Sequence, residues 1–329
     1  MSARVHYQRL EFRDVEAEEF KEILDRSDIE HTIIGGQRGA AEIEQFHGQA
    51  FSLDRGHYGF PVVVRGQFAP GCICIGMVKG VKVPTWINGS ETARGDLQFY
   101  SEGADILYRA GPEANWAGLT VTRERLQAEA RKRLGKELAL PDPGDMEHLR
   151  IDPEAFDRLA RLIRLLRPAP NGISPFRDAE ASAQLVLGAY AEAIATTDPS
   201  TAGAIRTRVT WRNQVVRRAD AFMRSLVGRN YSSARVCKDL GMSERNLELY
   251  FREALGVSPK AWFHHLCLHR ARAMLRHRKG HVTDVALACG FEHFGRFAEG
   301  YRKLFGERPS ETLRSAGSPK PAAILGRPA

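Results

Sequence analysis

Short apolar runs alternate with glycine-rich turns over residues 31–122. Runs of this length at intervals of roughly 8–12 residues are typical of strands in an antiparallel sandwich or barrel. Asn88-Gly89, between two such runs, favours a two-residue hairpin because both residues tolerate positive φ. Residues 14–25, by contrast, have the spacing of a short helix. The first part of the chain is therefore predicted to be a β domain preceded by one helix.

Helical periodicity replaces this pattern further along the chain. Residues 123–135 and 179–195 each predict a helix, and the Pro- and Gly-containing stretch 138–152 predicts a loop. Residues 153–167 predict a strongly amphipathic helix with proline at its first position. Its apolar stripe either packs on the β domain or forms a dimer interface, and the breadth of the leucine face favours the dimer. The stripe consists of Phe156, Leu159, Ile163 and Leu166, with Leu162 and Leu165 beside it.

Two further segments, residues 233–255 and 283–306, share one pattern. In each, a short helix ends at a glycine, Gly241 or Gly290, which can adopt positive φ and turn the chain sharply. A second helix follows, with apolar residues every three or four positions and a polar opposite face. Helix-turn-helix pairs of this kind place the second helix in the DNA major groove. A long helix over residues 260–278 separates the two units.

The charge of the chain is divided unevenly, although its total is only +8. Residues 1–205 contain 24 Lys and Arg against 30 Asp and Glu, a net charge of −6. Residues 206–314 contain 22 against 10, a net charge of +12. A strongly basic helical part attached to an acidic part indicates nucleic acid as the partner of the basic one. Together with the two helix-turn-helix patterns, this charge predicts double-stranded DNA.

Several other classes of protein are disfavoured by the same sequence. No apolar run approaches the roughly 18 residues of a membrane span, and the N-terminus lacks the apolar core of a secretory signal. The five cysteines are odd in number and lie among apolar residues, which predicts reduced thiols in a cytoplasmic protein. No cluster of His, Cys or carboxylate residues has metal-ligand spacing. We therefore expect no metal, no cofactor and no enzymatic activity.

The stretch ALACGFEHFGRFAEGYRKLFGERPSETLR, residues 286–314, together with the two units on one central helix, resembles the AraC/XylS family of bacterial transcription regulators. The resemblance covers about residues 213–314 and includes the CGF sequence, Phe297, the KLFG turn and Pro309. It implies that both recognition helices enter adjacent major grooves on one face of the DNA. Gly295 departs from the more usual serine, which removes a polar phosphate contact and weakens the helix. We therefore expect the second unit to bind DNA more weakly than the first.

The polar faces of the two recognition helices supply candidate DNA contacts. Arginine can donate two hydrogen bonds to guanine, and asparagine can pair with adenine. The candidate base readers are therefore Arg245, Asn246, His293 and Arg296. The residues expected to hold phosphates and set the register are Ser243, Arg252, Arg302 and Lys303. Glu244 completes the predicted DNA-binding face.

The order of turns and strands in the N-terminal part resembles the small cupin-like barrel that binds effectors in many regulators. A second resemblance concerns the R-x-x-x-R formed by Arg9 and Arg13 and the Asp25 and Ser27 that follow. It is similar to the motifs by which PilZ domains bind cyclic di-GMP, since paired guanidinium groups can bind guanine and bridge phosphates. The resemblance extends to AraC-like activators of exopolysaccharide genes. It implies that these four residues form the effector site and that cyclic di-GMP is the effector.

The alternative effector is a sugar or another small metabolite held inside the barrel. Aromatic residues would contact it, although such residues more often belong to the core. The candidates are Trp86, Tyr100, Tyr108 and Trp116. With either effector, ligand binding would shift a dimerisation or domain-orientation equilibrium and so position the DNA readers.

These patterns and resemblances together predict an α+β protein, with a cupin-like antiparallel β-barrel plus helices followed by an all-α double helix-turn-helix domain. The expected divisions are an effector domain over 1–152, a dimerisation helix and linker over 153–205, a DNA-binding domain over 206–316 and a disordered tail over 317–329. The expected function is effector-controlled transcription activation in the cytoplasm, at the nucleoid. The expected partners are DNA, a second copy of the chain and RNA polymerase, without a membrane.

Overall fold

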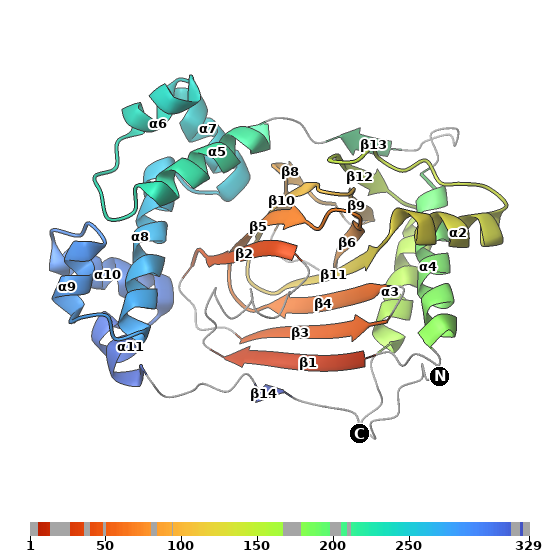
Figure 1. Cartoon of the computed structure of the whole chain (residues 1–329), viewed down its shortest axis with the longest axis horizontal. Helices are drawn as coiled ribbons and strands as arrows, with labels where there is room; N and C mark the ends of the chain where they lie inside the picture. The colour runs from red at the N-terminus through yellow and green to blue at the C-terminus, as the bar shows by residue number, and fades with distance from the viewer. Residues whose placement is uncertain are drawn as a thin grey trace.

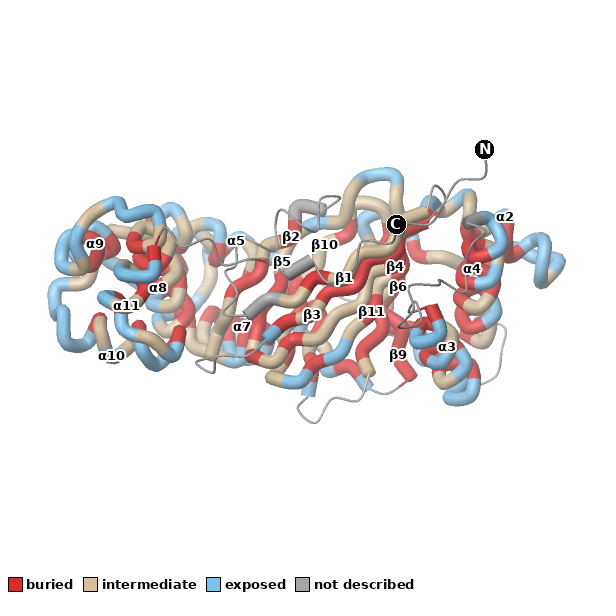
Figure 2. Tube along the Cα trace, turned by 90° about the horizontal axis from the view of Figure 1, so that it is seen from below, coloured by how far each residue is buried: buried red, intermediate tan, exposed pale blue. Residues whose placement is uncertain are grey.

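The computed structural model has two β-sheets in the middle, with helices at both ends of its long axis (Figure 1). Helices α2–α4 lie at one end and helices α5–α11 at the other, an arrangement that Figure 2 shows from below. The structure describes residues 6–13, 27–35, 40–48, 51–79, 84–93, 95–166, 179–197, 205–208, 212–316 and 323–324. The helix expected over residues 14–25 lies outside the described residues.

The larger sheet has nine strands in the order β13-β12-β9-β6-β11-β4-β3-β1-β14. Every neighbouring pair in it is antiparallel. The strands are β1 (His6–Arg13), β3 (Ala40–His47), β4 (Ser52–Tyr58), β6 (Ile73–Lys79), β9 (Asp96–Tyr100), β11 (Ala114–Val121), β12 (Met146–Arg150), β13 (Ile205–Arg208) and β14 (Ala323–Ile324).

The smaller sheet has five strands in the order β2-β5-β10-β7-β8. They are β2 (Ser27–Ile33), β5 (Val62–Phe68), β7 (Trp86–Ile87), β8 (Ser90–Glu91) and β10 (Asp105–Ala110). The hairpin between β7 and β8 is confirmed, because Asn88 and Gly89 have φ angles of 49° and 79°. The two sheets share one core, in which Leu10 and Ile43 of the larger sheet meet Val62 and Val64 of the smaller.

The expectation of a cupin-like barrel is corrected by this topology, because the two sheets do not join into a closed barrel among the described residues. At one edge of the larger sheet β12 pairs with β13, and at the other edge β1 pairs with β14. Closure would require these outer strands to pair with β2 or β8 instead. The loop expected over residues 138–152 is also wrong in part, because β12 lies within it and pairs with β9.

Helices α2 (Arg123–Leu134), α3 (Pro153–Leu165) and α4 (Ala179–Ala195) pack against the larger sheet. Phe156, Leu159 and Ile163 of α3 are buried in the same core as strand residues such as Leu119. The Arg55 guanidinium of β4 donates to the Ile163 carbonyl oxygen at 2.9 Å, and so joins the sheet to α3. The stripe itself therefore packs within the chain, whereas Leu165 beside it is 68% exposed. A role of α3 in a dimer stays a prediction.

The C-terminal domain contains two helical units that share the long helix α8 (Pro259–Arg276). The first unit places α5 (Arg212–Ser225), α6 (Ser233–Leu240) and α7 (Glu244–Leu255) around the N-terminal part of α8. The second packs α9 (Val282–Ala288), α10 (Phe294–Phe305) and α11 (Pro309–Ser315) around its C-terminal part. This arrangement agrees with the two helix-turn-helix units predicted. Strand β13 extends across the expected boundary at residue 205, because it belongs to the larger sheet.

Candidate DNA-binding surface and ligand cavity

In the first unit, local capping fixes the start of the recognition helix α7. Gly241 ends α6 with a φ of 64°, and the Ser243 hydroxyl accepts a hydrogen bond from the backbone N–H of Asn246 at 3.2 Å. Leu247 and Phe251 are buried against the rest of the unit. The helix therefore turns its first residues, which include Arg245, outward.

In the second unit, α10 is held by an aromatic face. Phe297 and Tyr301 are buried, and the Tyr301 hydroxyl donates to Thr312 Oγ1 of α11 at 2.8 Å. Thr312 in turn donates to Glu307, which forms an ion pair of 3.1 Å with Arg272 of α8. This network was not predicted from sequence, and it fixes the orientation of α10 on the central helix.

All of the predicted DNA-binding residues are exposed. Arg252 also pairs with Glu248 one turn earlier, at 2.7 Å, so its charge is partly compensated within the helix. The structure brings the set together in two exposed groups, one at α7 and one at α10, while DNA contact itself stays a prediction. The exposed set is Ser243, Glu244, Arg245, Asn246, Arg252, His293, Arg296, Arg302 and Lys303.

The first unit also packs against the smaller β-sheet. Val63 of β5 and Leu107 of β10 are buried in the same core as residues of α5, α7 and α8. Polar contacts surround this core: Arg65 pairs with Asp220 at 2.8 Å, and Arg217 pairs with Asp105. The interface was not predicted from sequence.

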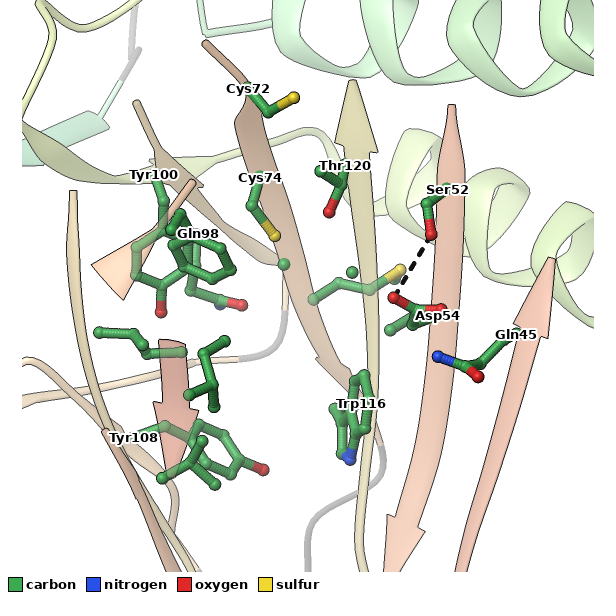
Figure 3. Close-up of a pocket in the computed structure, with 18 of the residues that line it drawn as sticks. Gln45, Ser52, Asp54, Cys72, Cys74, Gln98, Tyr100, Tyr108, Trp116 and Thr120 are labelled. Carbon is green, nitrogen blue, oxygen red and sulfur yellow. Dashed lines mark hydrogen bonds between the residues drawn. The ribbon is translucent and has the colours of Figure 1, made fainter. Parts of the chain in front are cut away.

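A cavity of about 890 Å³ lies between the two sheets. Figure 3 shows Gln45, Asp54 and Trp116 from the larger sheet facing it, with Tyr108 on the other side. Three of the four aromatic candidates for metabolite binding line it: Tyr100, Tyr108 and Trp116. Trp86 does not, and instead the Arg109 guanidinium lies 3.5 Å from the centre of its ring.

Buried polar groups of the cavity wall include His31 and two tyrosines. His31 Nε2 lies 2.8 Å from the Tyr58 hydroxyl, and burial lowers the pKa of His31 from 6.5 to about 3. Burial raises the pKa of Tyr108, whose hydroxyl has no hydrogen-bond partner within the described part of the protein. His31 and Tyr108 are therefore both uncharged at neutral pH.

Acidification is expected to destabilise the fold through His31. Its lowered pKa means that the unfolded chain binds more protons between pH 6.5 and 3, so stability falls as pH falls through that window. At pH 5 the loss is about 2 kcal/mol, from about 1.4 kcal/mol per pKa unit. Urea unfolding at pH 7 and pH 5 measures it, with His31→Gln for comparison. An equal pH effect in both proteins would contradict this role of His31.

The four residues predicted to bind cyclic di-GMP are only partly described. Arg9 lies on β1 between Gln8 and Leu10, which line the cavity, so alternation puts Arg9 on the opposite face of the sheet. Its guanidinium donates to Glu42 at 2.7 Å, which raises the pKa of Arg9. The side chains of Arg13 and Ser27 and all of Asp25 lie outside the described residues. Binding of cyclic di-GMP at these positions stays a prediction.

The sequence predicts neither a metal site nor a membrane span, and both features can be looked for in the described part of the chain. Within it, His, Cys, Asp and Glu form no group of three that could hold a metal ion. Its helices include none that combines the length and apolar character needed to cross a membrane.

Comparison with known proteins identifies the class of the C-terminal domain. Residues 236–315 match a family described as a helix-turn-helix domain. Over 105 residues the chain is 39% identical to the XylDLEGF operon transcriptional activator of Pseudomonas putida, which covers 31% of this chain and 33% of that protein. Over 76 residues it is 33% identical to the transcriptional activator RhaS of Escherichia coli, covering 23% and 27%. The chain thus spans about a third or less of the length of these relatives.

A solved structure, of a probable AraC family transcriptional regulator from Rhodopseudomonas palustris, is 33% identical, with a TM-score of 0.30. The similarity covers 31% of this chain and 97% of that one. The family match shows that residues 236–315 form a helix-turn-helix domain. Over this domain the chain is similar to the transcriptional activators named above, in line with the resemblance noted for residues 286–314. The relatives are transcriptional regulators and not enzymes, in agreement with the expectation for this chain.

Proposed function

We propose that the protein is a transcription activator whose DNA binding is controlled by a small molecule in the cavity between the sheets. The observation that supports this proposal most strongly is that strands β2, β5 and β10 contact both the cavity and the DNA-binding domain. One face of these strands lines the cavity, and the other face holds the first helix-turn-helix unit. A ligand that moves the strands therefore acts directly on the DNA-binding domain.

Side chains along β5 and β10 point alternately to the cavity and to the first helical unit. On β5, Val64 lines the cavity, while Val63 is buried against the first helical unit. On β10, Ile106 and Tyr108 line the cavity, while Leu107 packs on the helices. Neighbouring residues of one strand thus contact the ligand site and the DNA-binding domain.

On β2 the same division holds through polar contacts. His31 faces the cavity, while Glu30 accepts a hydrogen bond from Arg65, which in turn pairs with Asp220 of α5. The carbonyl oxygen of Ile33, at the end of β2, lies 2.8 Å from Nε2 of His269 on α8. A ligand controls the domain only if it binds the two arrangements of these strands with different affinities.

The exposed helices α7 and α10 support sequence-specific DNA binding in this proposal. The net charge of +12 over residues 206–314 adds attraction to phosphates. Their shared central helix α8 suits two readers that occupy adjacent major grooves. A homodimer, contact with RNA polymerase and a location in the cytoplasm belong to the same proposal.

Selection of duplexes from a random DNA pool by the full chain tests the proposal. We expect recovery of a preferred sequence spanning two neighbouring major grooves, bound about 10³-fold or more tightly than random DNA. The affinity should also fall steeply with rising salt, because phosphate contacts release counterions. Recovery of no preferred sequence, or affinity that is independent of salt, would count against a sequence-specific regulator.

A further inference from the structure

We infer that the cavity takes a ligand with an apolar body and an uncharged or amine head group that donates hydrogen bonds, and that it discriminates against carboxylates and phosphates. The inference rests on the proposed function only in treating the cavity as the effector site. It concerns the chemistry of the ligand, whereas the proposed function concerns what the ligand does to DNA binding.

The first argument for this ligand class is the charge of the cavity wall. Among the described residues that line it, none is lysine or arginine. The one carboxylate there is Asp54, and His31 is held neutral by burial. An anion entering this cavity would lose its hydration and meet a carboxylate, with no lysine or arginine among the described lining residues to compensate it, which is costly in a low-dielectric site.

A polar wall on the larger sheet determines where the head group binds. Asp54 is its centre: Oδ1 lies 3.3 Å from His47 Nε2, and Oδ2 accepts from the Ser52 hydroxyl at 3.5 Å. Both distances are long for hydrogen bonds, so the carboxylate keeps capacity for a stronger donor. Gln8 and Gln45, hydrogen-bonded to each other, extend this wall. A ligand hydroxyl or ammonium group matches such an acceptor.

Tyr108, on the smaller sheet, supplies a second polar contact. Its side chain is only 6% exposed and lines the cavity, and its hydroxyl has no hydrogen-bond partner within the part of the chain that is described. A buried hydroxyl without a partner is unfavourable, and a hydrogen bond to a ligand oxygen or nitrogen would remove that cost. The cavity lining also includes the apolar and aromatic side chains of Phe68, Ile106 and Trp116, the last of which Figure 3 labels.

Three probes with one body and different heads test the ligand class: 2-naphthylmethanol, 2-naphthylmethylamine and 2-naphthoate. Calorimetric titration into the full chain measures each dissociation constant. We expect the alcohol and the amine to bind and the carboxylate to bind at least tenfold more weakly. Equal or tighter binding of the carboxylate would overturn the inferred class. Absence of binding by all three at millimolar concentration would overturn it as well.

Variants of the cavity wall locate the binding site. Asp54→Asn should weaken the amine most and reduce the discrimination against the carboxylate, and Tyr108→Phe should weaken the alcohol several-fold. Gly118→Leu fills the cavity, because a Cβ at Gly118 would meet only Cys74 Sγ, at 3.6 Å. It should abolish binding of all the probes, whereas Gly118→Ala should not. Binding that persists in Gly118→Leu, in a variant that melts like the wild type, would place the site elsewhere.

A final comparison separates this inference from the proposed function. DNA affinity is measured with and without the probe that binds tightest. If the probe binds as expected but leaves DNA affinity unchanged, the proposal that a cavity ligand controls DNA binding is wrong, while the inferred ligand class is supported. If the carboxylate binds best and changes DNA affinity, the ligand class is wrong and the control stands.

Discussion

Replacing Asp220 by alanine is expected to lower the free energy of unfolding by about 3–5 kcal/mol, the cost of breaking a buried charge network. The carboxylate is only 3% exposed. Its Oδ1 accepts from the Trp262 indole N–H at 2.7 Å, and its Oδ2 lies 2.8 Å from Arg65. The truncation leaves the buried indole N–H without its acceptor and removes one of the two carboxylate partners of Arg65, which keeps Glu30. Urea unfolding measures the loss.

Two comparisons make the Asp220 result specific. Asp239→Ala removes an exposed carboxylate from α6 of the same unit and should cost no more than about 0.5 kcal/mol. Asp220→Asn keeps an acceptor for Trp262 but loses the charge facing Arg65, so its loss should lie between the other two. A loss below 1 kcal/mol for Asp220→Ala would show that the network contributes little.

Replacing Arg245 by alanine is expected to weaken binding to the selected duplex by about 1–3 kcal/mol, or roughly 5- to 150-fold, and to relax specificity at one base pair. Arg245 lies exposed in the first turn of α7, where Ser243 caps the helix. Arg296 of α10 should matter less, because Gly295 beside it lacks a side chain and weakens the start of that helix. Fluorescence anisotropy with the selected duplex and its single-base variants measures both effects.

Lys303→Ala serves as the matched control, since an exposed lysine that holds a phosphate should lower affinity similarly for every sequence. It should also reduce the dependence of binding on salt. Equal losses of specificity for Arg245→Ala and Arg296→Ala, or a larger loss for Arg296→Ala, would reverse the assigned order of the two readers.

The helix-turn-helix units could be predicted from sequence because short-range patterns determine them. Leu247 and Phe251 recur at helical spacing, as do Phe297 and Tyr301, and all four are buried. The turns depend on one glycine each, and serine caps α7 directly. Such signals act within one or two helical turns, so they can be recognised in the sequence without knowledge of the rest of the fold.

The β domain could be predicted only as a set of strands, because pairing at the sheet edges depends on distant segments. β13 comes from the linker before the DNA-binding domain, and β14 from near the C-terminus. Both cover edges of the larger sheet, and neither was predicted as a strand. β12 was missed because Pro141, Pro143 and Gly144 precede it and it has only five residues.

One local signal could have indicated the interface between the domains. Val62, Val63 and Val64 are all buried, and such an uninterrupted apolar run is typical of a strand covered on both faces. The run therefore predicts a partner on each side of β5, although not which partner. The partners of Arg65 and Asp105 lie far along the chain, so their pairing follows only from the fold.

Two neighbouring truncations test most directly the claim that the cavity and the DNA-binding domain are coupled through shared strands. Leu107→Ala weakens the contact of β10 with the helices, while Ile106→Ala removes a comparable side chain from the cavity side of the same strand. The measurement is the affinity of each full-length variant for the selected duplex without ligand. We predict at least a fivefold change for Leu107→Ala, in the range of allosteric coupling energies, and less than about twofold for Ile106→Ala. Unchanged affinity in Leu107→Ala, or equal changes in both, would contradict the coupling.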